Sequence, residues 1–220
     1  GIEKIQQNLT SGEVKVLDVG CGVGYFLKTL GKTVSTYSLY GIEPNPKLAK
    51  QAQNFVKSAK IINSSIENAA LKENYFDVIT FWDVLEHVYD PIKTLKSTHK
   101  LLKKNGIVVI QAPNYRSLMT FMTKENWDWW LPPDHLYHFS PKSMELLLKK
   151  SGFKLKYMET RESKEIFVKN IRAQIKGNSF FTKATRKMFG VFLNLIYPLI
   201  EIVTTVTKTG GLVFVVAQKV

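Results

Sequence analysis

The sequence predicts an α/β fold in which helices cover both faces of a parallel sheet. Short apolar runs rich in β-branched residues alternate with helical segments along the first 160 residues, and this alternation is typical of parallel strands joined by helices. The length of 220 residues, with 45% hydrophobic and 22% charged residues, suits one domain with an ample core. Glycines directly after the first apolar run indicate a tight strand-to-helix turn at one edge of the sheet.

Three short strands and two helices are expected in the first part of the chain. The first strand is β-branched and runs directly into glycines, which favours a buried parallel strand. The first helix should end near Gly31, and Glu43 and Pro44 close the second strand. The expected elements are strand Val14–Val19, helix Tyr25–Leu30, strand Thr36–Ile42, helix Pro46–Val56 and strand Ile61–Ile62.

The alternation is expected to continue in the second part of the chain. Pro91 and Pro141 suit the first position of a helix, and Ser140 is a favourable N-cap. Asn105–Gly106 and Gly152 should end these two helices. In the helix that begins at Pro91, the residues predicted to share one face are Ile92, Leu95 and Leu102. In the helix that begins at Pro141, the residues predicted to point inward are Met144, Leu147 and Leu148. The expected elements are strand Phe76–Phe81, helix Pro91–Leu102, strand Ile107–Ala112, helix Pro141–Lys150, strand Phe153–Thr160 and strand Gly211–Val220.

The turn that follows the first strand, with the sequence V-L-D-V-G-C-G-V-G, indicates a ligand site. Gly20, Gly22 and Gly24 let the backbone turn sharply and approach a ligand without interference from side chains. The next helix points free N–H groups and its positive dipole end at that ligand. Tyr25 stands where a dinucleotide-binding G-x-G-x-x-G turn requires glycine, which disfavours a nicotinamide cofactor. An ordinary tight turn is the alternative.

Glu43 strengthens the ligand interpretation. It ends the second strand about 20 residues after the glycine turn, where an open α/β sheet presents its strand ends to a ligand. A carboxylate there can accept hydrogen bonds from both hydroxyls of a ribose. A solvated carboxylate at a strand end is the alternative.

These residues together resemble the class I methyltransferases that depend on S-adenosylmethionine (SAM). The glycine turn resembles the first motif of that family, and Gly41-Ile42-Glu43 resembles its ribose-binding acid. The run from Trp82 to Val88, W-D-V-L-E-H-V, is closest to the ubiquinone/menaquinone-type and sugar-modifying small-molecule branch. The segment from His135, H-L-Y-H-F-S-P, also recurs in that branch. The resemblance covers roughly residues 14–160 and 211–219.

The resemblance implies a Rossmann-like fold and a SAM site. The expected sheet has seven strands, mostly parallel, with the last strand antiparallel and a helical insertion before it. SAM is the implied cofactor, with S-adenosylhomocysteine as its product, and Asn63–Asn68 falls where the family places its adenine-contacting loop. The implied cofactor-binding residues are Asp18, Gly20, Cys21, Gly22, Gly24, Glu43, Pro44, Ser65, Ile66, Glu67, Trp82 and Asp83.

Histidines are the natural bases near neutral pH, and two of the four are candidates for catalysis. His135 lies between the fifth strand and the next helix, where this fold builds acceptor pockets, and it is the preferred base. His87 follows the fourth strand and either faces the pocket or organises its loop. His138 is expected to anchor its segment, and His99 to be structural. The sequence lacks H-E-x-x-H and cysteine–histidine clusters, so no metal site is predicted.

Trp127, Trp129 and Trp130 form a dense aromatic stretch before His135. One interpretation is a lid that excludes water and stacks on the acceptor. The alternative is a loop that bulky side chains hold against the core.

Residues 161–209 are expected to form a helical insertion, while residues 1–160 and 210–220 form the SAM-binding domain. The insertion has nine Lys or Arg and three Glu, followed by a run, Met188–Val206, in which Glu201 is the one charge. This order is typical of a segment that lies on an anionic membrane surface, here over residues 165–207. A helical pair packed on the sheet edge, or a homodimer interface, explains the pattern equally well. Nucleic acid is a less favoured partner, because no recognition module is recognisable.

The composition and the motifs together predict an enzyme. We expect a SAM-dependent methyltransferase that acts on a small, hydrophobic or lipid-linked acceptor, most readily at oxygen. The net charge of +13 keeps a tRNA methyltransferase as one alternative, and a SAM-binding regulatory protein without catalysis as another. The single cysteine, Cys21, cannot form an internal disulfide. The polar start, Gly1–Leu9, lacks a secretory pattern. We therefore expect a cytoplasmic protein. If the insertion binds lipid, the protein is expected to attach peripherally to the inner face of the membrane.

Overall fold

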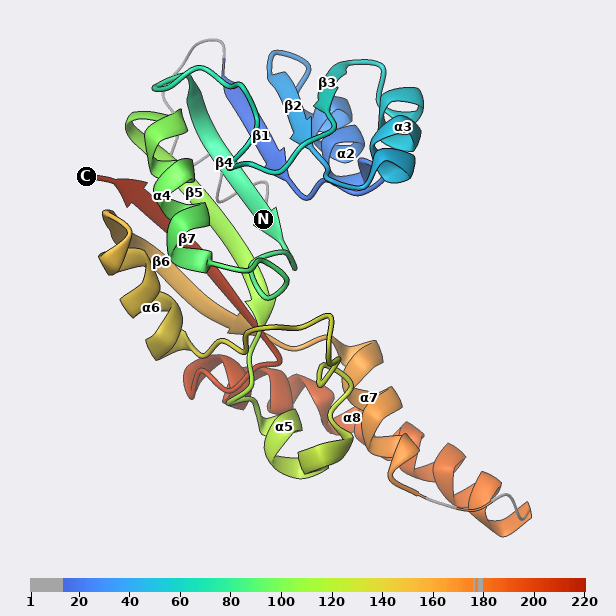
Figure 1. The fold of residues 1–220 in the computed structure, drawn as a ribbon. Helices are drawn as coiled ribbons and strands as arrows, with labels where there is room; N and C mark the ends of the chain where they lie inside the picture. The colour runs from blue at the N-terminus through green and yellow to red at the C-terminus, as the bar shows by residue number, and fades with distance from the viewer. Residues whose placement is uncertain (1–13, 176, 178–179) are drawn as a thin grey trace.

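A single seven-stranded sheet organises the structure, a computed structural model that describes residues 14–175, 177 and 180–220 (Figure 1). The predicted polar start, Gly1–Leu9, lies outside the described residues. The strand order is β3-β2-β1-β4-β5-β7-β6. The strands are β1 (Lys15–Val19), β2 (Ser38–Ile42), β3 (Ala59–Ile62), β4 (Phe76–Trp82), β5 (Leu102–Pro113), β6 (Phe153–Arg161) and β7 (Leu212–Lys219).

The predicted mixture of parallel and antiparallel strands is confirmed. β1 to β5 pair in parallel, and β7 runs antiparallel to both β5 and β6. β6 therefore points the same way as the parallel strands, and its carboxyl end lies at the same edge of the sheet as theirs. This edge is where an open α/β sheet binds ligands.

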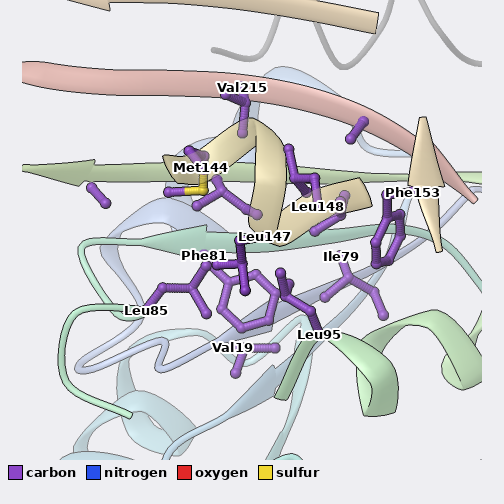
Figure 2. Close-up of a cluster of buried hydrophobic side chains, with 14 of the residues drawn as sticks. Val19, Ile79, Phe81, Leu85, Leu95, Met144, Leu147, Leu148, Phe153 and Val215 are labelled. Carbon is purple, nitrogen blue, oxygen red and sulfur yellow. The ribbon is translucent and has the colours of Figure 1, made fainter. Parts of the chain in front are cut away.

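Helices cover both faces of the sheet, as predicted. α4 and α6 pack on one face, where Leu95, Met144 and Leu148 meet Phe81 and Val215 in a fully buried cluster (Figure 2). α2 and α3 pack on the other face through small and branched side chains. The helices are α2 (Tyr25–Thr33), α3 (Pro46–Phe55), α4 (Pro91–Leu101), α5 (Leu118–Thr123), α6 (Pro141–Lys150), α7 (Lys164–Ala173) and α8 (Phe180–Val206), with a short 3-10 turn η1 (Lys124–Asn126).

Side-chain caps fix where the helices begin. Asn45 accepts hydrogen bonds from the first turn of α3, and Asp90 caps α4 in the same way. Ser140 and Ser143 form a reciprocal capping box at the start of α6. The predicted positions of Pro91 and Pro141 at the first turn are confirmed.

The predicted break between α4 and the next strand is wrong. β5 begins at Leu102, directly after the helix, rather than at Ile107. Leu102 is fully buried and pairs with Phe76, so burial draws it into the strand. Asn105 adopts a left-handed φ of 63°, and the pairing with β4 shifts register across this segment. Asn105–Gly106 therefore forms a bulge inside the strand, a conformation that asparagine and glycine tolerate.

Smaller differences also follow from packing. Leu95 is fully buried in α4, whereas Ile92 is partly exposed and Leu102 belongs to the strand, so these residues do not share one helix face. The second strand begins at Ser38 rather than Thr36, and the third begins at Ala59, earlier than expected.

The insertion before the last strand consists of α7 and α8, which project together from the carboxyl edge of the sheet beside α5 (Figure 1). A third buried cluster joins these helices to the segment that follows β5. Its members are Met119, Trp127, Phe167, Val168, Ile171, Leu193 and Tyr197. α5 was not expected from the sequence, and it supplies Met119 to this cluster.

Candidate active site

The glycine turn is held in a left-handed conformation that other residues rarely adopt. Gly20, Gly22 and Gly24 have φ values of 68°, 53° and 89°. A Cβ at Gly20 would lie 2.6 Å from a methyl carbon of Val84, and one at Gly24 would lie 2.7 Å from a methyl carbon of Val56. A Cβ at Gly22 would meet no atom within 4 Å. Two of the glycines thus permit close packing, and the third leaves open space beside the turn.

Glu43 ties the end of β2 to this turn. Its carboxylate accepts a hydrogen bond from the Gly22 backbone N–H at 2.9 Å and another from the Asn45 N–H at 2.9 Å. The Asn63 side chain donates to the carbonyl oxygens of Glu43 and Pro44. Each carboxylate oxygen keeps a further lone pair for a ligand. The role of Asn63 was not expected from the sequence.

A cavity of about 400 Å³ lies between these elements at the carboxyl edge of the sheet. Eight of the predicted cofactor residues line it, together with the candidate His87. The six other lining residues were not predicted as site residues: Val19, Ile42, Leu48, Val84, Val88 and Thr94. The lining consists of Val19, Gly20, Gly22, Ile42, Glu43, Pro44, Leu48, Ser65, Ile66, Glu67, Asp83, Val84, His87, Val88 and Thr94.

The loop after β3 is held at this cavity by α4. The Thr94 hydroxyl donates a hydrogen bond to the Glu67 carboxylate, so the first turn of α4 fixes the position of that side chain. Ile66 is buried beneath the loop and joins the main core cluster. Ser65, Ile66 and Glu67 therefore form one wall of the cavity, in the place that the resemblance implies.

The other predicted cofactor residues support the site without lining the cavity. Asp18 is buried, accepts a hydrogen bond from the Thr80 hydroxyl at 2.7 Å, and has a pKa that burial raises to about 7. Cys21 packs its sulfur against Gly41, which has no room for a Cβ. Trp82 stacks on Phe214 in the core of the second face. These three residues therefore pack around the site, and none of them lines the cavity.

Asp83 lines the cavity from the end of β4. It adopts a left-handed φ of 54°, and its carboxylate accepts hydrogen bonds from the Gln111 side chain. Burial raises the pKa of this carboxyl, while Gln111 and His87 oppose the shift.

The two candidate catalytic histidines lie together, with His87 lining the cavity and His135 packed beside it outside the lining. The ring centroids of His87 and His135 are 4.7 Å apart in an edge-on arrangement. His87 Nδ1 contacts the carbonyl oxygen of Asp134 at 2.8 Å. His135 is buried, and its Nδ1 has no hydrogen-bond partner among the described residues. Burial lowers the pKa of His135, the neighbouring His87 lowers it further, and a hydrogen bond with the Trp129 backbone opposes the shift. The ring is therefore neutral near pH 7.

Glu86 completes this cluster, although the sequence analysis did not single it out. Its backbone carbonyl accepts from the N–H groups of Leu136 and Tyr137, which fastens the loop after β4 to the segment of His135. The side chain is buried, neither carboxylate oxygen finds a partner in the described part of the chain, and burial raises its pKa to about 8.

This cluster can move a proton or hold a cation. Glu86, His87 and His135 each bring one ligand atom within 4.8 Å of the others. The prediction of no metal site rests on the absence of contiguous zinc motifs, which does not address ligands drawn from two separate loops. That prediction therefore stays a prediction.

The tryptophans act mainly as packing residues. Trp127 is buried in the third cluster, and Trp130 donates its indole N–H to the Lys124 carbonyl. Trp129 stacks on His135 at a ring-centroid distance of 6.0 Å and so covers the candidate base. His138 packs edge-on against Trp130. His99 contacts Phe153 and the Val220 carbonyl far from the cavity.

The family model described as a methyltransferase domain matches residues 2–157, more than half of the chain. The chain belongs to the SAM-dependent methyltransferase family. A ubiquinone biosynthesis O-methyltransferase of Actinobacillus pleuropneumoniae is 33% identical over 115 residues, which cover 49% of this chain and 49% of the relative. Another from Nitrosospira multiformis is 34% identical over 104 residues, 45% and 43% of the two chains. The chain thus spans about half the length of the curated relatives it matches.

Solved structures share the methyltransferase fold. A SAM-dependent methyltransferase from Archaeoglobus fulgidus aligns with a TM-score of 0.65 and 18% identity, covering 99% of this chain and 91% of that one. The cyclase SpnF aligns with a TM-score of 0.67 and 16% identity, covering 99% and 79%. These similarities extend the likeness in fold beyond the residues that the family model matches.

SAM is the cofactor of this methyltransferase family, and the residues of the cavity fit it. The open space at Gly22 and the free lone pairs of Glu43 suit an adenosyl group. A volume of about 400 Å³ falls in the range of small-molecule sites, about 300–1,000 Å³. Glu43 would hold the ribose, and the walls from Ile66 and Val88 would enclose the adenine side.

Proposed function

We propose that the protein transfers the methyl group of SAM to a hydroxyl of a small acceptor that is hydrophobic or lipid-linked. The observation that carries this proposal is the pair of histidine rings 4.7 Å apart, of which His87 lines the cavity and His135 is buried beside it with a lowered pKa. Methyl transfer to a hydroxyl oxygen needs a base that removes the hydroxyl proton. The names of the relatives, O-methyltransferases of ubiquinone biosynthesis, support oxygen as the acceptor atom.

The environment of His135 suits it to act as a base. The ring is buried, its Nδ1 has no hydrogen-bond partner among the described residues, and burial lowers its pKa. A neutral imidazole nitrogen can accept a proton. Trp129 covers the ring and excludes water from it.

Positioning carries most of the remaining chemistry. SAM supplies a methyl group on a sulfonium, which is a good leaving group, so the protein mainly has to align the acceptor oxygen with that methyl. His87 lines the cavity and its Nδ1 contacts Asp134, which fixes the ring between the cofactor site and His135. In this proposal His87 orients the acceptor hydroxyl and His135 takes its proton.

The cavity beside His87 is largely apolar. Val84 and Val88 lie close to His87 in the chain and line the cavity together with Ile66. Ligand sites with mainly apolar walls favour a ligand with a hydrophobic part. This lining supports a hydrophobic acceptor.

Incubation with methyl-labelled SAM and an extract of the native cells tests this function. We expect label in a product that partitions into organic solvent and releases its methyl on ether cleavage, and little label with His135→Gln. Label in the RNA fraction would favour a tRNA methyltransferase instead. SAM binding without any labelled product would favour the regulatory protein.

A further inference from the structure

The outer face of α8 is apolar from Met188 to Val206. Its side chains point away from the fold and are separated by three or four residues, the spacing of one helix face. Leu195, Leu199 and Val206 are 76%, 64% and 77% exposed. The full face consists of Met188, Phe192, Leu195, Leu199, Ile202 and Val206. An exposed stripe of this length marks an interaction site on a soluble fold.

The opposite face of α8 is already used by the protein. Leu193 and Tyr197 are buried in the third cluster, and Thr204 is fully buried. α8 is therefore apolar on two faces, one packed against the protein and one without a described partner. The wide outer face exceeds what the internal packing of the fold requires.

Basic residues border this apolar face. Lys183 and Lys187 are exposed on the strip of α8 between its two apolar faces, and Lys208 follows its end. Beside this strip, α7 and α8 enclose a shallow groove of about 660 Å³, whose lining includes Lys164, Lys169 and Arg172. Lys169 also pairs with Asp128 at 3.6 Å. Glu165 is the one acidic residue in the groove lining. Apolar side chains bordered by lysine and arginine complement a surface of lipid tails and anionic headgroups.

The contacts of α8 decide between lying on a membrane and crossing it. The helix is long and apolar enough to span a bilayer by length and composition. However, the Tyr197 hydroxyl donates to the Glu162 carbonyl at 2.8 Å, and the Thr160 hydroxyl donates to the Thr204 carbonyl at 3.1 Å. Crossing would break these bonds and the third cluster. The helix can instead present its outer face while it stays docked.

We propose that α8 lies in the plane of an anionic lipid surface, with its outer apolar face in the headgroup boundary and the basic residues of α7 and α8 on the headgroups. The carboxyl ends of β1, β4 and β6 share one edge of the sheet, so this surface lies on the same side of the molecule as the cofactor cavity. A lipid-linked acceptor would then reach His135 without leaving the membrane. The docking itself does not depend on the chemistry of the acceptor.

Flotation of the full chain with vesicles tests this inference. Vesicles of equal parts phosphatidylglycerol and phosphatidylcholine should carry the protein, and vesicles of phosphatidylcholine alone should carry much less. Leu195→Gln with Leu199→Gln should weaken the binding at least about tenfold, because two apolar side chains would no longer enter the lipid. Ile92→Gln is the matched control, since Ile92 is a partly exposed aliphatic residue on α4. This variant should bind the vesicles as well as the wild type does.

A second pair of variants separates the charge from the apolar contact. Lys183→Gln and Lys187→Gln should each weaken binding to the anionic vesicles about fivefold at low salt, and high salt should remove this difference. Circular dichroism and SAM calorimetry on the same preparations show whether each variant is folded. A variant that loses vesicle binding but keeps SAM binding therefore tests the role of α8 in lipid binding. Such a result has no bearing on the proposed function.

Three outcomes would overturn the inference. In the first, the wild type does not float with anionic vesicles at low salt. In the second, the wild type and the doubly substituted α8 variant float equally. In the third, light scattering finds a dimer that the α8 substitutions convert to a monomer while neither protein binds vesicles, so that the outer face joins two copies of the chain.

Discussion

The Glu43 carboxylate accepts a hydrogen bond from the Gly22 backbone N–H at 2.9 Å, so the end of β2 holds the glycine turn beside the cavity. The same carboxylate bonds the Asn45 N–H at the start of α3. One side chain thus connects the turn after β1 with the helix after β2. The proposed ribose contact and the shape of the turn therefore depend on the same residue.

Glu43→Gln should weaken SAM binding by about 1.5–3 kcal/mol, or roughly 10–150-fold, because charge-assisted hydrogen bonds are lost. Titration calorimetry measures the effect directly. Glu145→Gln is the control, because Glu145 is exposed on α6 and absent from the lining of the cavity. Equal affinities of the two variants would show that Glu43 does not hold the cofactor.

Substitutions of two glycines should separate packing from ligand contact. Gly20→Ala should cost about 1–3 kcal/mol in the free energy of unfolding beyond the backbone strain, because its Cβ would lie 2.6 Å from Val84. Gly22→Ala should cost only the strain of a left-handed residue, about 1–2 kcal/mol. Urea unfolding without SAM measures both. Val84→Ala should recover part of the loss in Gly20→Ala and none in Gly22→Ala; recovery in both variants would contradict the packing described here.

The buried carboxyl of Asp18 should make stability depend on pH. Its pKa is raised from 3.8 to about 7 in the folded protein, so the unfolded chain ionises first as the pH rises. The favourable contribution is present below about pH 4 and is lost between pH 4 and 7, with a slope of at most about 1.4 kcal/mol per pH unit. Asp18→Asn keeps an acceptor for Thr80 and removes the titration, so its stability relative to wild type should rise across this window. If the free energies of unfolding of the two proteins changed with pH by the same amount, the burial of Asp18 would be contradicted.

His135→Gln should leave the SAM dissociation constant unchanged and lower turnover by about 10²–10⁴-fold, the usual contribution of a base. Since the pKa of His135 is lowered from its ordinary value of 6.5, the acid limb of the wild-type rate profile should lie below that pH. Turnover by the wild-type protein should also be measured after a chelator has removed metal ions. We expect no loss of turnover. A loss that Mg²⁺ or Mn²⁺ restores would mean that Glu86, His87 and His135 hold a cation instead.

Local signals in the sequence predicted most of the fold. The glycine turn and Glu43 could be placed at one edge of the sheet because each follows directly on a strand, and the carboxyl ends of parallel strands meet there. The loop around Ile66 was placed by the family resemblance. The caps at Ser140 and Pro91 could be placed because they act within one turn of a helix.

Features that depend on tertiary packing could not be predicted. Thr94 reaches the site because α4 packs beside it, and the Asn63 side chain bonds the carbonyls of Glu43 and Pro44; no local pattern predicts either contact. The β5 bulge at Asn105 arises because burial of Leu102 outweighs the turn propensity of asparagine and glycine. Glu86 was not singled out, because its burial depends on the segment of His135, which fastens to its backbone carbonyl.

The interpretation of the tryptophans shows the same limit. A lid and a packed loop have the same sequence pattern, and only the third cluster shows that Trp127 packs beneath α7 and α8. Trp129 alone reaches the histidine pair. Sequence spacing could not separate these two roles because neighbouring residues in a loop point in different directions.

Titration calorimetry of the wild-type chain with SAM is the most direct test of the cofactor cavity formed by the glycine turn and Glu43. We predict saturable binding of one SAM per chain and no measurable heat with a nicotinamide dinucleotide under the same conditions. An absence of SAM binding by a folded sample, or preferential binding of the nicotinamide dinucleotide, would contradict the assignment of this cavity and the function proposed from it.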